Sequence, residues 1–434
     1  MKSHLSSSVF LLLLFILIFA PIAYGAVDTW AFATIALILL AVYLIWISDV
    51  IRSGQLKFSN NPLQLPILGL IVIGIIQLLP FRSVSVDSLS IVSSISLDPY
   101  ATRFAVIQLF LYALFFSSAL VFISDESRVR KTAIFAIVLG SLFAFLGILQ
   151  QLTDPNTIFG FRIVKDAIPF GTFVNRHHFA AFMVMLAGLS FGIAYSKSLK
   201  SDRLILIWIA IIMMILAILM TGSRGAFLSL IATISLVLFL SERLSDFRGR
   251  LLVAVFVLFS SIVLLVILLG ADEWLARSIG LNIQQDISSG RFHFWAVAWR
   301  IFLDHPILGT GLDSFAVVFP KYDTWNGTFR VERAHNDYLQ MLSDAGLLGF
   351  VCVIAFIYLL FSQAKRSIDG QKNDFLKGIK IGALAGCFGI LVHSFFDFPL
   401  RTNSNAFYFL LLSCFASEPF QAEQSSNKEI SGGH

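Results

Sequence analysis

Long apolar runs separated by short polar connections make up most of this 434-residue chain. A helix needs about 20 predominantly apolar residues to cross the hydrocarbon core of a bilayer, with roughly 17 as the lower limit. The pattern therefore predicts an all-α polytopic membrane protein with about twelve transmembrane helices. They are expected at 8–24, 29–48, 63–80, 102–123, 132–152, 172–195, 204–221, 224–240, 251–270, 336–361, 377–396 and 403–418.

The composition agrees with a lipid environment. Hydrophobic residues account for 57% of the chain and charged residues for 13%, whereas soluble proteins average roughly 25% charged residues. A soluble fold of this size could not bury so much apolar surface. The net charge of +5 comes from short basic clusters between the apolar runs. Such clusters are typical of membrane topology signals, so no nucleic-acid partner is expected.

The N-terminal run allows two interpretations. Residues 9–24 resemble the apolar core of a signal peptide, and the following "YGA" resembles a cleavage site. Because many further spans follow, a retained first helix is the simpler interpretation. Lys and Arg concentrate in the short connections of one side of the membrane. By the positive-inside rule this places both termini in the cytoplasm.

One outer connection is long enough to have structure of its own. It divides the chain into a nine-helix membrane region at 1–270, an outer loop at 271–335, three C-terminal membrane helices at 336–418 and a polar tail at 419–434. The tail is expected to be disordered in the cytoplasm. The membrane parts are expected to form one integrated domain.

Two local patterns predict how helices pack. Within the outer loop, residues 290–303 read as an amphipathic helix whose aromatic stripe suits the headgroup level of a bilayer. This stripe consists of Phe292, Trp295, Trp299 and Phe302. In the span 377–396 a glycine occupies every fourth position, at Gly378, Gly382 and Gly386. This repeat predicts close contact with another helix.

Arginines gather on the outer side of the membrane, at Arg176, Arg224, Arg291, Arg330 and Arg333. Any one of them could simply reach toward lipid phosphates. Arg224, however, begins the span 224–240, where the helix dipole repels a cation. A cation placed there needs an anionic partner, and the planar fork of arginine binds two phosphate oxygens at once.

An outward site rich in arginine suggests a phosphorylated lipid as ligand. A glycan on a polyprenyl pyrophosphate fits, because the departing pyrophosphate gathers negative charge that fixed cations can stabilise. No metal is expected. Neighbouring helical residues such as His177 and His178 point about 100° apart and do not form a metal site by themselves.

His335 is the candidate base. It precedes the span 336–361, where the helix dipole disfavours imidazolium and helps to keep the ring able to accept a proton. Asn336 or Asp337 can cap that helix. Alternatively, His335 is only a hydrogen-bonded residue at a helix start. Asp397 follows the span 377–396, where it could pair with His393 or with one of the arginines.

Several ordered segments of the chain resemble the bacterial O-antigen ligase and O-antigen polymerase superfamily of membrane proteins. The matching segments are "FVNRHHFAAF", "TGSRGAF", "SGRFHFW" followed by "HPILGTGLDSF", "AHNDYLQMLSDAGLLG" and "HSFFDFPLRTNSNAF". The resemblance covers about 170 to 415, whereas the first five spans match only in hydropathy. His177 departs from the pattern, since asparagine is more usual there.

The resemblance implies a GT-C-type glycosyltransferase in the bacterial inner membrane. It implies that an undecaprenyl-pyrophosphate-linked glycan is used at the periplasmic face, without a metal or other cofactor and with inversion at the anomeric carbon. Arg224 and Arg291 would bind the pyrophosphate and His335 would serve the acceptor hydroxyl. Arg176, Arg330, Arg333, Asn336 and Asp397 are possible supporting residues.

The acceptor stays open at the level of sequence. A polymerase would extend lipid-linked repeat units of a surface or exported polysaccharide, and the resemblance slightly favours this reading. A ligase would move the glycan onto the lipid A core. A transporter of the same lipid-linked glycan could also carry cations and aromatics, but it should show repeated halves with broken helices at mid-membrane. No such repeat is visible in the sequence.

Overall fold

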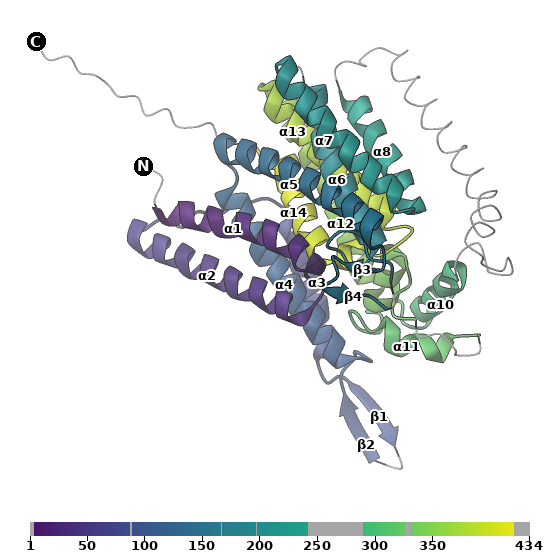
Figure 1. Ribbon diagram of the computed structural model, residues 1–434. Coiled ribbons are helices and arrows are strands. Elements are labelled where there is room, and N and C mark those ends of the chain that lie inside the picture. Colours follow the sequence, from purple (N-terminus) through teal and green to yellow (C-terminus); the bar gives the residue numbers. More distant parts are fainter. Residues whose placement is uncertain are drawn as a thin grey trace, which may run out of the picture.

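The computed structural model describes residues 4–86, 89–165, 167–196, 198–241, 290–325 and 331–420. The described part consists mainly of long helices (Figure 1). The N-terminal half contains α1 (His4–Ile22), η1 (Tyr24–Ala26), α2 (Thr29–Ser53), α3 (Gln64–Leu78), α4 (Pro99–Phe122), α5 (Glu126–Thr153), α6 (Arg176–Tyr195), α7 (Ser201–Met220) and α8 (Arg224–Leu240). The C-terminal part contains α10 (Arg291–Asp304), α11 (Phe315–Tyr322), α12 (Asp337–Asp369), α13 (Asp374–His393), η3 (Pro399–Arg401) and α14 (Asn403–Ser417).

Several helix starts follow directly from the sequence. Asp98, Asp125, Asn175 and Ser223 immediately precede α4, α5, α6 and α8, and each side chain accepts a hydrogen bond from a backbone N–H of the first turn. Such caps satisfy donors that the helix itself leaves open. The caps of α6 and α8 fix where these two helices begin, and therefore where Arg176 and Arg224 lie.

Eleven of the expected spans coincide with a described helix, and the run at 251–270 lies outside the described residues. By length and composition, 8 of the described helices can cross a membrane, and α3 and α8 are shorter apolar helices. The multi-pass, all-α prediction is confirmed, whereas the count of twelve stays a prediction. Two small hairpins were not predicted: β1 (Arg82–Val86) pairs with β2 (Leu89–Ser93), and β3 (Thr157–Ile158) pairs with β4 (Arg162–Ile163).

Glycines bring α6 and α13 into backbone contact, as the repeat in α13 predicts. A Cβ placed on Gly192 of α6 would lie 2.3 Å from the carbonyl oxygen of Gly378, and one on Gly188 would lie 2.7 Å from the backbone nitrogen of Gly386. Only glycine permits this approach. Because α6 starts at the end of the bundle where α13 finishes, the contact sets the histidines and arginine of the α6 start beside the segment that follows α13.

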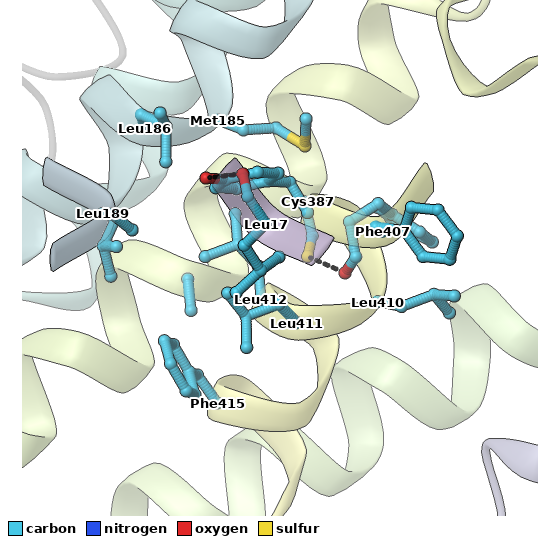
Figure 2. Close-up of a cluster of buried hydrophobic side chains, with 14 of the residues drawn as sticks. Leu17, Met185, Leu186, Leu189, Cys387, Phe407, Leu410, Leu411, Leu412 and Phe415 are labelled. Atoms are coloured by element: carbon cyan, nitrogen blue, oxygen red, sulfur yellow. Dashed lines mark hydrogen bonds between the residues drawn. The ribbon is translucent and has the colours of Figure 1, made fainter. Parts of the chain in front are cut away.

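The core of the bundle lies around α14, all of whose residues are buried. Figure 2 shows Phe407, Leu411 and Phe415 of this helix packed with Leu17 of α1 and Leu186 of α6. The thiol of Cys387 lies 3.7 Å from the carbonyl oxygen of Phe409, to which it can donate only weakly. Burial of α14 on all sides fixes η3, directly before it, relative to the rest of the bundle.

Helix α12 is interrupted at Gly346, whose φ of 62° and ψ of −161° are not helical. The chain after α10 packs into this break: Leu347 N–H donates to Pro306 O at 2.7 Å, and Gly311 N–H donates to Asp344 O at 2.9 Å. A Cβ on Gly309 would lie 2.4 Å from the carbonyl carbon of Asp344, so a larger residue would push the two segments apart. The loop before α11 is thereby fixed to the first turns of α12.

The predicted amphipathic helix is present as α10. Val297, Ala298 and Ile301 face inward against α11, whereas Phe292 and Trp299 of the aromatic stripe are 66% and 47% exposed. In Figure 1, α10, α11 and the β1–β2 hairpin lie at the opposite end of the molecule from the first residues of α1. At the C-terminus, the ring of Phe420 lies under Lys380 Nζ, and residues 421–434 are outside the described part.

Candidate active site

Two segments far apart in sequence form the centre of the site. His335 precedes α12 and has a φ of 51°, which is uncommon for a residue other than glycine. Its Nδ1 lies 3.2 Å from Oδ1 of Asp397, in the segment between α13 and η3. The same Oδ1 accepts a hydrogen bond from the Phe398 N–H at 2.9 Å. The predicted base therefore has a carboxylate partner 62 residues further along the chain.

The charge of Asp397 follows from its neighbours. Burial acts to raise the pKa of this carboxyl, but the hydrogen bond with His335 and the nearby histidines outweigh it and hold the pKa below its usual range. An ionised carboxylate accepts a proton-bearing Nδ1–H, which leaves the lone pair of the neutral ring on Nε2. His335 is thus oriented so that Nε2 can accept a proton.

An arginine lies directly beside this pair. Arg291, the first residue of α10, has Nη2 at 3.8 Å from Oδ2 of Asp397. Arg176 and Arg224 are the first residues of α6 and α8. The charges of Arg224 and Arg291 repel that of Arg176, so the three form one electrostatic cluster.

Among the described residues, Arg176 and Arg291 have little counter-charge. Arg176 makes no ion pair within the described part of the chain. The single carboxylate near Arg291 is already engaged by His335. The N-terminal ends of α6 and α8 add the positive ends of their helix dipoles. Such an arrangement favours an anion with several oxygens, such as a phosphate or pyrophosphate.

Aromatic and polar contacts fix the chain segments of the site relative to one another. The ring of Phe398 lies between His178 and His335, with ring centroids 4.9 Å and 5.0 Å away. His178 Nδ1 is 2.6 Å from the hydroxyl of Thr402. His177 Nδ1 is 2.8 Å from the hydroxyl of Ser223, which joins the start of α6 to the start of α8. The site is therefore supported on several sides.

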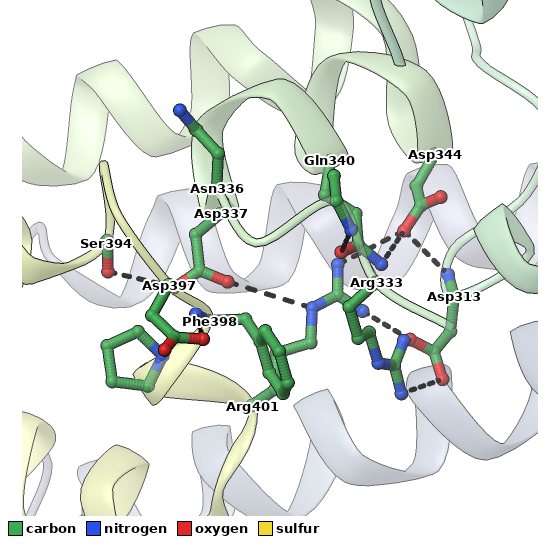
Figure 3. A network of polar contacts seen from close by, with 12 residues as sticks. Asp313, Arg333, Asn336, Asp337, Gln340, Asp344, Ser394, Asp397, Phe398 and Arg401 are labelled. Carbon is green, nitrogen blue, oxygen red and sulfur yellow. Dashed lines mark hydrogen bonds and ion pairs between the residues drawn. The ribbon is translucent and has the colours of Figure 1, made fainter. Parts of the chain in front are cut away.

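A second group of charges lies beside the first (Figure 3). Asp313 accepts hydrogen bonds from both Arg333 and Arg401. Arg401 also donates to Asp344 Oδ2 at 3.1 Å, and its Nε is 3.9 Å from Asp337 Oδ1. The guanidinium groups hold the pKa of Asp313 below its usual range although burial acts in the opposite direction. The carboxylates in turn raise the pKa of Arg401 despite its burial.

The backbone at Asp313 is adapted to this role. Its φ of 67° is left-handed, and Gly311 just before it has a φ of 119°. A non-glycine residue in this region costs free energy and persists where surrounding contacts hold it. Here the contacts are the two arginines and the packing of the loop into the α12 break. Asp313 thus ties the loop to the segment of His335 through Arg333, and to the segment of Asp397 through Arg401.

The remaining predicted residues are placed as follows. Asn336 caps α12, since its side chain accepts from Tyr338 N–H and Leu339 N–H, each at 3.0 Å. Asp397 pairs with an arginine, as one of the two sequence alternatives stated. His393 Nδ1 is buried without a hydrogen-bond partner, so the alternative pairing of Asp397 with the His393 side chain does not form. Arg330 lies outside the described residues.

Arg401, Asp313 and Asp344 were not among the residues predicted for the site. The available signal was an unusual one: charged residues within or beside apolar segments, as in "GLDSF", "LSDAG" and "FPLRT". Among the described residues, no group of three or more His, Cys, Asp or Glu side chains is placed to hold a metal ion.

Comparisons with known proteins agree with the resemblance. An "Uncharacterized protein" of Haemophilus influenzae (strain ATCC 51907 / DSM 11121 / KW20 / Rd) is 22% identical over 227 residues, which cover 48% of this chain and 55% of that protein. The chain thus spans about half the length of the curated relative it matches. Residues 209–354, which include Arg224, Arg291 and His335, match the family described as O-Antigen ligase. Over these residues the chain is therefore similar to the O-antigen ligase family, which supports the resemblance seen in the sequence.

Proposed function

We propose that this protein transfers a glycan from an undecaprenyl-pyrophosphate carrier to an acceptor hydroxyl at the periplasmic face of the bacterial inner membrane. The observation that carries the proposal is the His335–Asp397 pair with Arg291 at 3.8 Å from the same carboxylate. A proton acceptor and an anion-binding group are the two components that displacement of a pyrophosphate needs. In this topology both termini are cytoplasmic.

In the proposed reaction, Nε2 of His335 accepts the proton of the acceptor hydroxyl. The acceptor oxygen forms a bond to the anomeric carbon while the bond from that carbon to the pyrophosphate oxygen breaks. The electron pair leaves with the pyrophosphate, whose growing charge is stabilised by Arg291, Arg224 and Arg176. Asp397 orients the ring and stabilises the imidazolium that forms. One direct displacement inverts the anomeric configuration.

Metal-independent chemistry is part of the proposal because arginines stand where a divalent cation would otherwise neutralise the pyrophosphate. The planar guanidinium can bind two oxygens of one phosphate. The helix N-termini at Arg176 and Arg224 contribute the positive ends of their helix dipoles. This is a GT-C-type arrangement in which cations fixed by the fold serve the leaving group.

For the acceptor we propose a second lipid-linked repeat unit, so that the product is a polymer of a surface or exported polysaccharide. The alternative is a ligase reaction in which the glycan is transferred to the lipid A core; the matching family is described as O-Antigen ligase. The two differ only in the acceptor, so the same site residues serve both.

The decisive experiment uses purified protein and a lipid-linked repeat unit, with and without lipid A core, in the presence of EDTA. A ladder of lipid-linked oligomers without lipid A core supports polymerisation. A product attached to the core supports the ligase alternative. Failure of folded protein to transfer glycan in either mixture would refute the proposal, and restoration of activity only by added divalent cation would refute metal independence.

A further inference from the structure

Trp325, just beyond α11, is held in one orientation by its neighbours. Its indole stacks on the ring of His293, with centroids 4.1 Å apart and planes 7° from parallel. Its backbone N–H donates to Asp323 Oδ1 at 3.0 Å, and His293 Nε2 lies 2.7 Å from the same oxygen. The hydrogen bond from Trp325 lowers the pKa of Asp323, with a further contribution from His293. Both the indole ring and the backbone of Trp325 are therefore held in place.

A glycine makes this arrangement possible. Gly290 has a φ of 80°, and a Cβ at this position would lie 3.2 Å from the indole of Trp325 and 2.9 Å from the ring of Phe294. Because Gly290 has no Cβ and tolerates a positive φ, the start of α10 can lie directly against the indole. Despite these contacts, Trp325 remains 44% exposed, so one part of the ring system is open.

The position of Trp325 relates it to the candidate active site. Phe294 lies between the two, with its ring centroid 6.1 Å from Trp325 and 6.2 Å from His335. Trp325 therefore stands only two ring contacts from the proposed base. A glycan whose reacting end is at His335 can extend over Phe294 toward the indole.

Contact with the membrane surface is the competing explanation for an exposed tryptophan. The stripe of Phe292, Trp295 and Trp299 on α10 suits that role. Trp325 packs instead on His293 and Phe294, which lie off this stripe because successive helical residues are about 100° apart. A lipid anchor also has no need for a rigid orientation, whereas a recognition surface gains from one.

We propose that Trp325 is a stacking platform for the glycan of the lipid-linked substrate. The open indole face would cover the apolar C–H face of a pyranose ring, and His293 would support the indole from behind. The inference rests on the proposed function, which supplies the glycan and its reacting end at His335. It assigns to Trp325 a contribution to glycan affinity and not to bond formation.

The test separates glycan binding from transfer. The probe is the phosphate-free repeat-unit oligosaccharide, released by mild acid from the lipid-linked donor of the producing strain. Its affinity is measured by ligand-observed NMR for purified wild-type protein and for Trp325→Phe, Trp325→Leu and Trp299→Ala. We expect Trp325→Leu to bind about tenfold more weakly, as for loss of one good aromatic contact. Trp325→Phe should keep most of the affinity, and the exposed Trp299 serves as the matched control.

A second measurement distinguishes failure of the stacking platform from failure of the proposed function. In transfer assays, Trp325→Leu should raise KM for the lipid-linked donor about tenfold with little change in kcat. Arg291→Ala should lose transfer but bind the free oligosaccharide like the wild type. Trp325-dependent binding without any wild-type transfer would refute the proposed function and leave the platform standing. Unchanged affinity in Trp325→Leu, or an equal loss in Trp299→Ala, would overturn the platform.

Discussion

Replacing Asp397 by asparagine removes one negative charge from the centre of the site and little else. Two donors converge on Oδ1 of Asp397, the ring Nδ1 of His335 at 3.2 Å and the Phe398 N–H at 2.9 Å. The Phe398 N–H cannot rotate away, so the asparagine must place its carbonyl oxygen at this position. The NH₂ group then takes the position of Oδ2, toward Arg291. His335 keeps its orientation and its Nδ1–H tautomer.

The magnitude follows from this geometry. A hydrogen bond to a charged group contributes about 1.5–3 kcal/mol and one between neutral groups about 1 kcal/mol. The imidazolium formed during transfer therefore loses about 1–2 kcal/mol of stabilisation, or roughly 5- to 30-fold in rate. If the amide instead turned its NH₂ toward the ring, the tautomer would reverse. The loss would then approach the roughly 10⁴-fold known for such a reversal in a catalytic triad.

The assay is kcat for transfer from the lipid-linked donor, measured across pH for wild type, Asp397→Asn and His335→Ala. The rate of His335→Ala should be lower than that of the wild type by about 10²–10⁴-fold, and it shows the rate that remains when the base is absent.

Asp304→Asn is the matched control, since Asp304 accepts a hydrogen bond from the Tyr322 hydroxyl in the same outer region without touching the site. A rate for Asp397→Asn within about twofold of wild type at every pH would refute the role of Asp397 as the partner of His335. A loss equal to that of His335→Ala would show that the amide reverses and that Phe398 does not fix it.

Three further predictions concern the arginines, the topology and the ion network. Arg224→Ala and Arg291→Ala should each lose about 10²–10³ in rate, with only partial recovery in the lysine variants, and full recovery in lysine would indicate simple contact with lipid phosphates. In a cysteine-free background, a single cysteine at Gly160 should react with an impermeant maleimide in intact cells and one at Gly370 should not; the reverse pattern would overturn the orientation. Asp313→Asn should destabilise the folded protein by about 3 kcal/mol because it leaves two arginines without their shared carboxylate, and an unchanged unfolding midpoint in detergent would contradict this.

Hydropathy predicted the helices well because lipid leaves no alternative for an apolar run of this length. The helical period likewise predicted α10, and the glycine spacing predicted the contact of α13 with α6. The hairpin of β1 and β2 was not predicted, although "SVSVDSLSIVS" alternates small polar and apolar residues around an Asp-Ser pair. Such alternation is typical of a short strand pair and was overlooked among the stronger helical signals.

The partner of Asp397 could not be chosen from the sequence. His177, His178, His335 and His393 all lie at the outer ends of spans, and each could have met the carboxylate. The choice depends on how deeply α6 and α13 interdigitate at their glycines and on where α14 fixes η3. These are tertiary distances of a few ångströms, which residue spacing does not encode. The network of Arg401 and Asp313 was missed for the same reason, since its members come from three separate segments.

The two groups of charges differ in a way that bears on function. Arg333 and Arg401 face Asp313, Asp337 and Asp344, so their charges are balanced by the protein itself. Within the described part of the chain, Arg291 has only the 3.8 Å contact with a carboxylate that already serves His335. The balanced network stabilises the positions of two chain segments. Arg333 thereby holds the segment of His335 in place, whereas Arg291 shares its one described carboxylate with His335 and keeps charge that an anionic ligand, as proposed above, could meet.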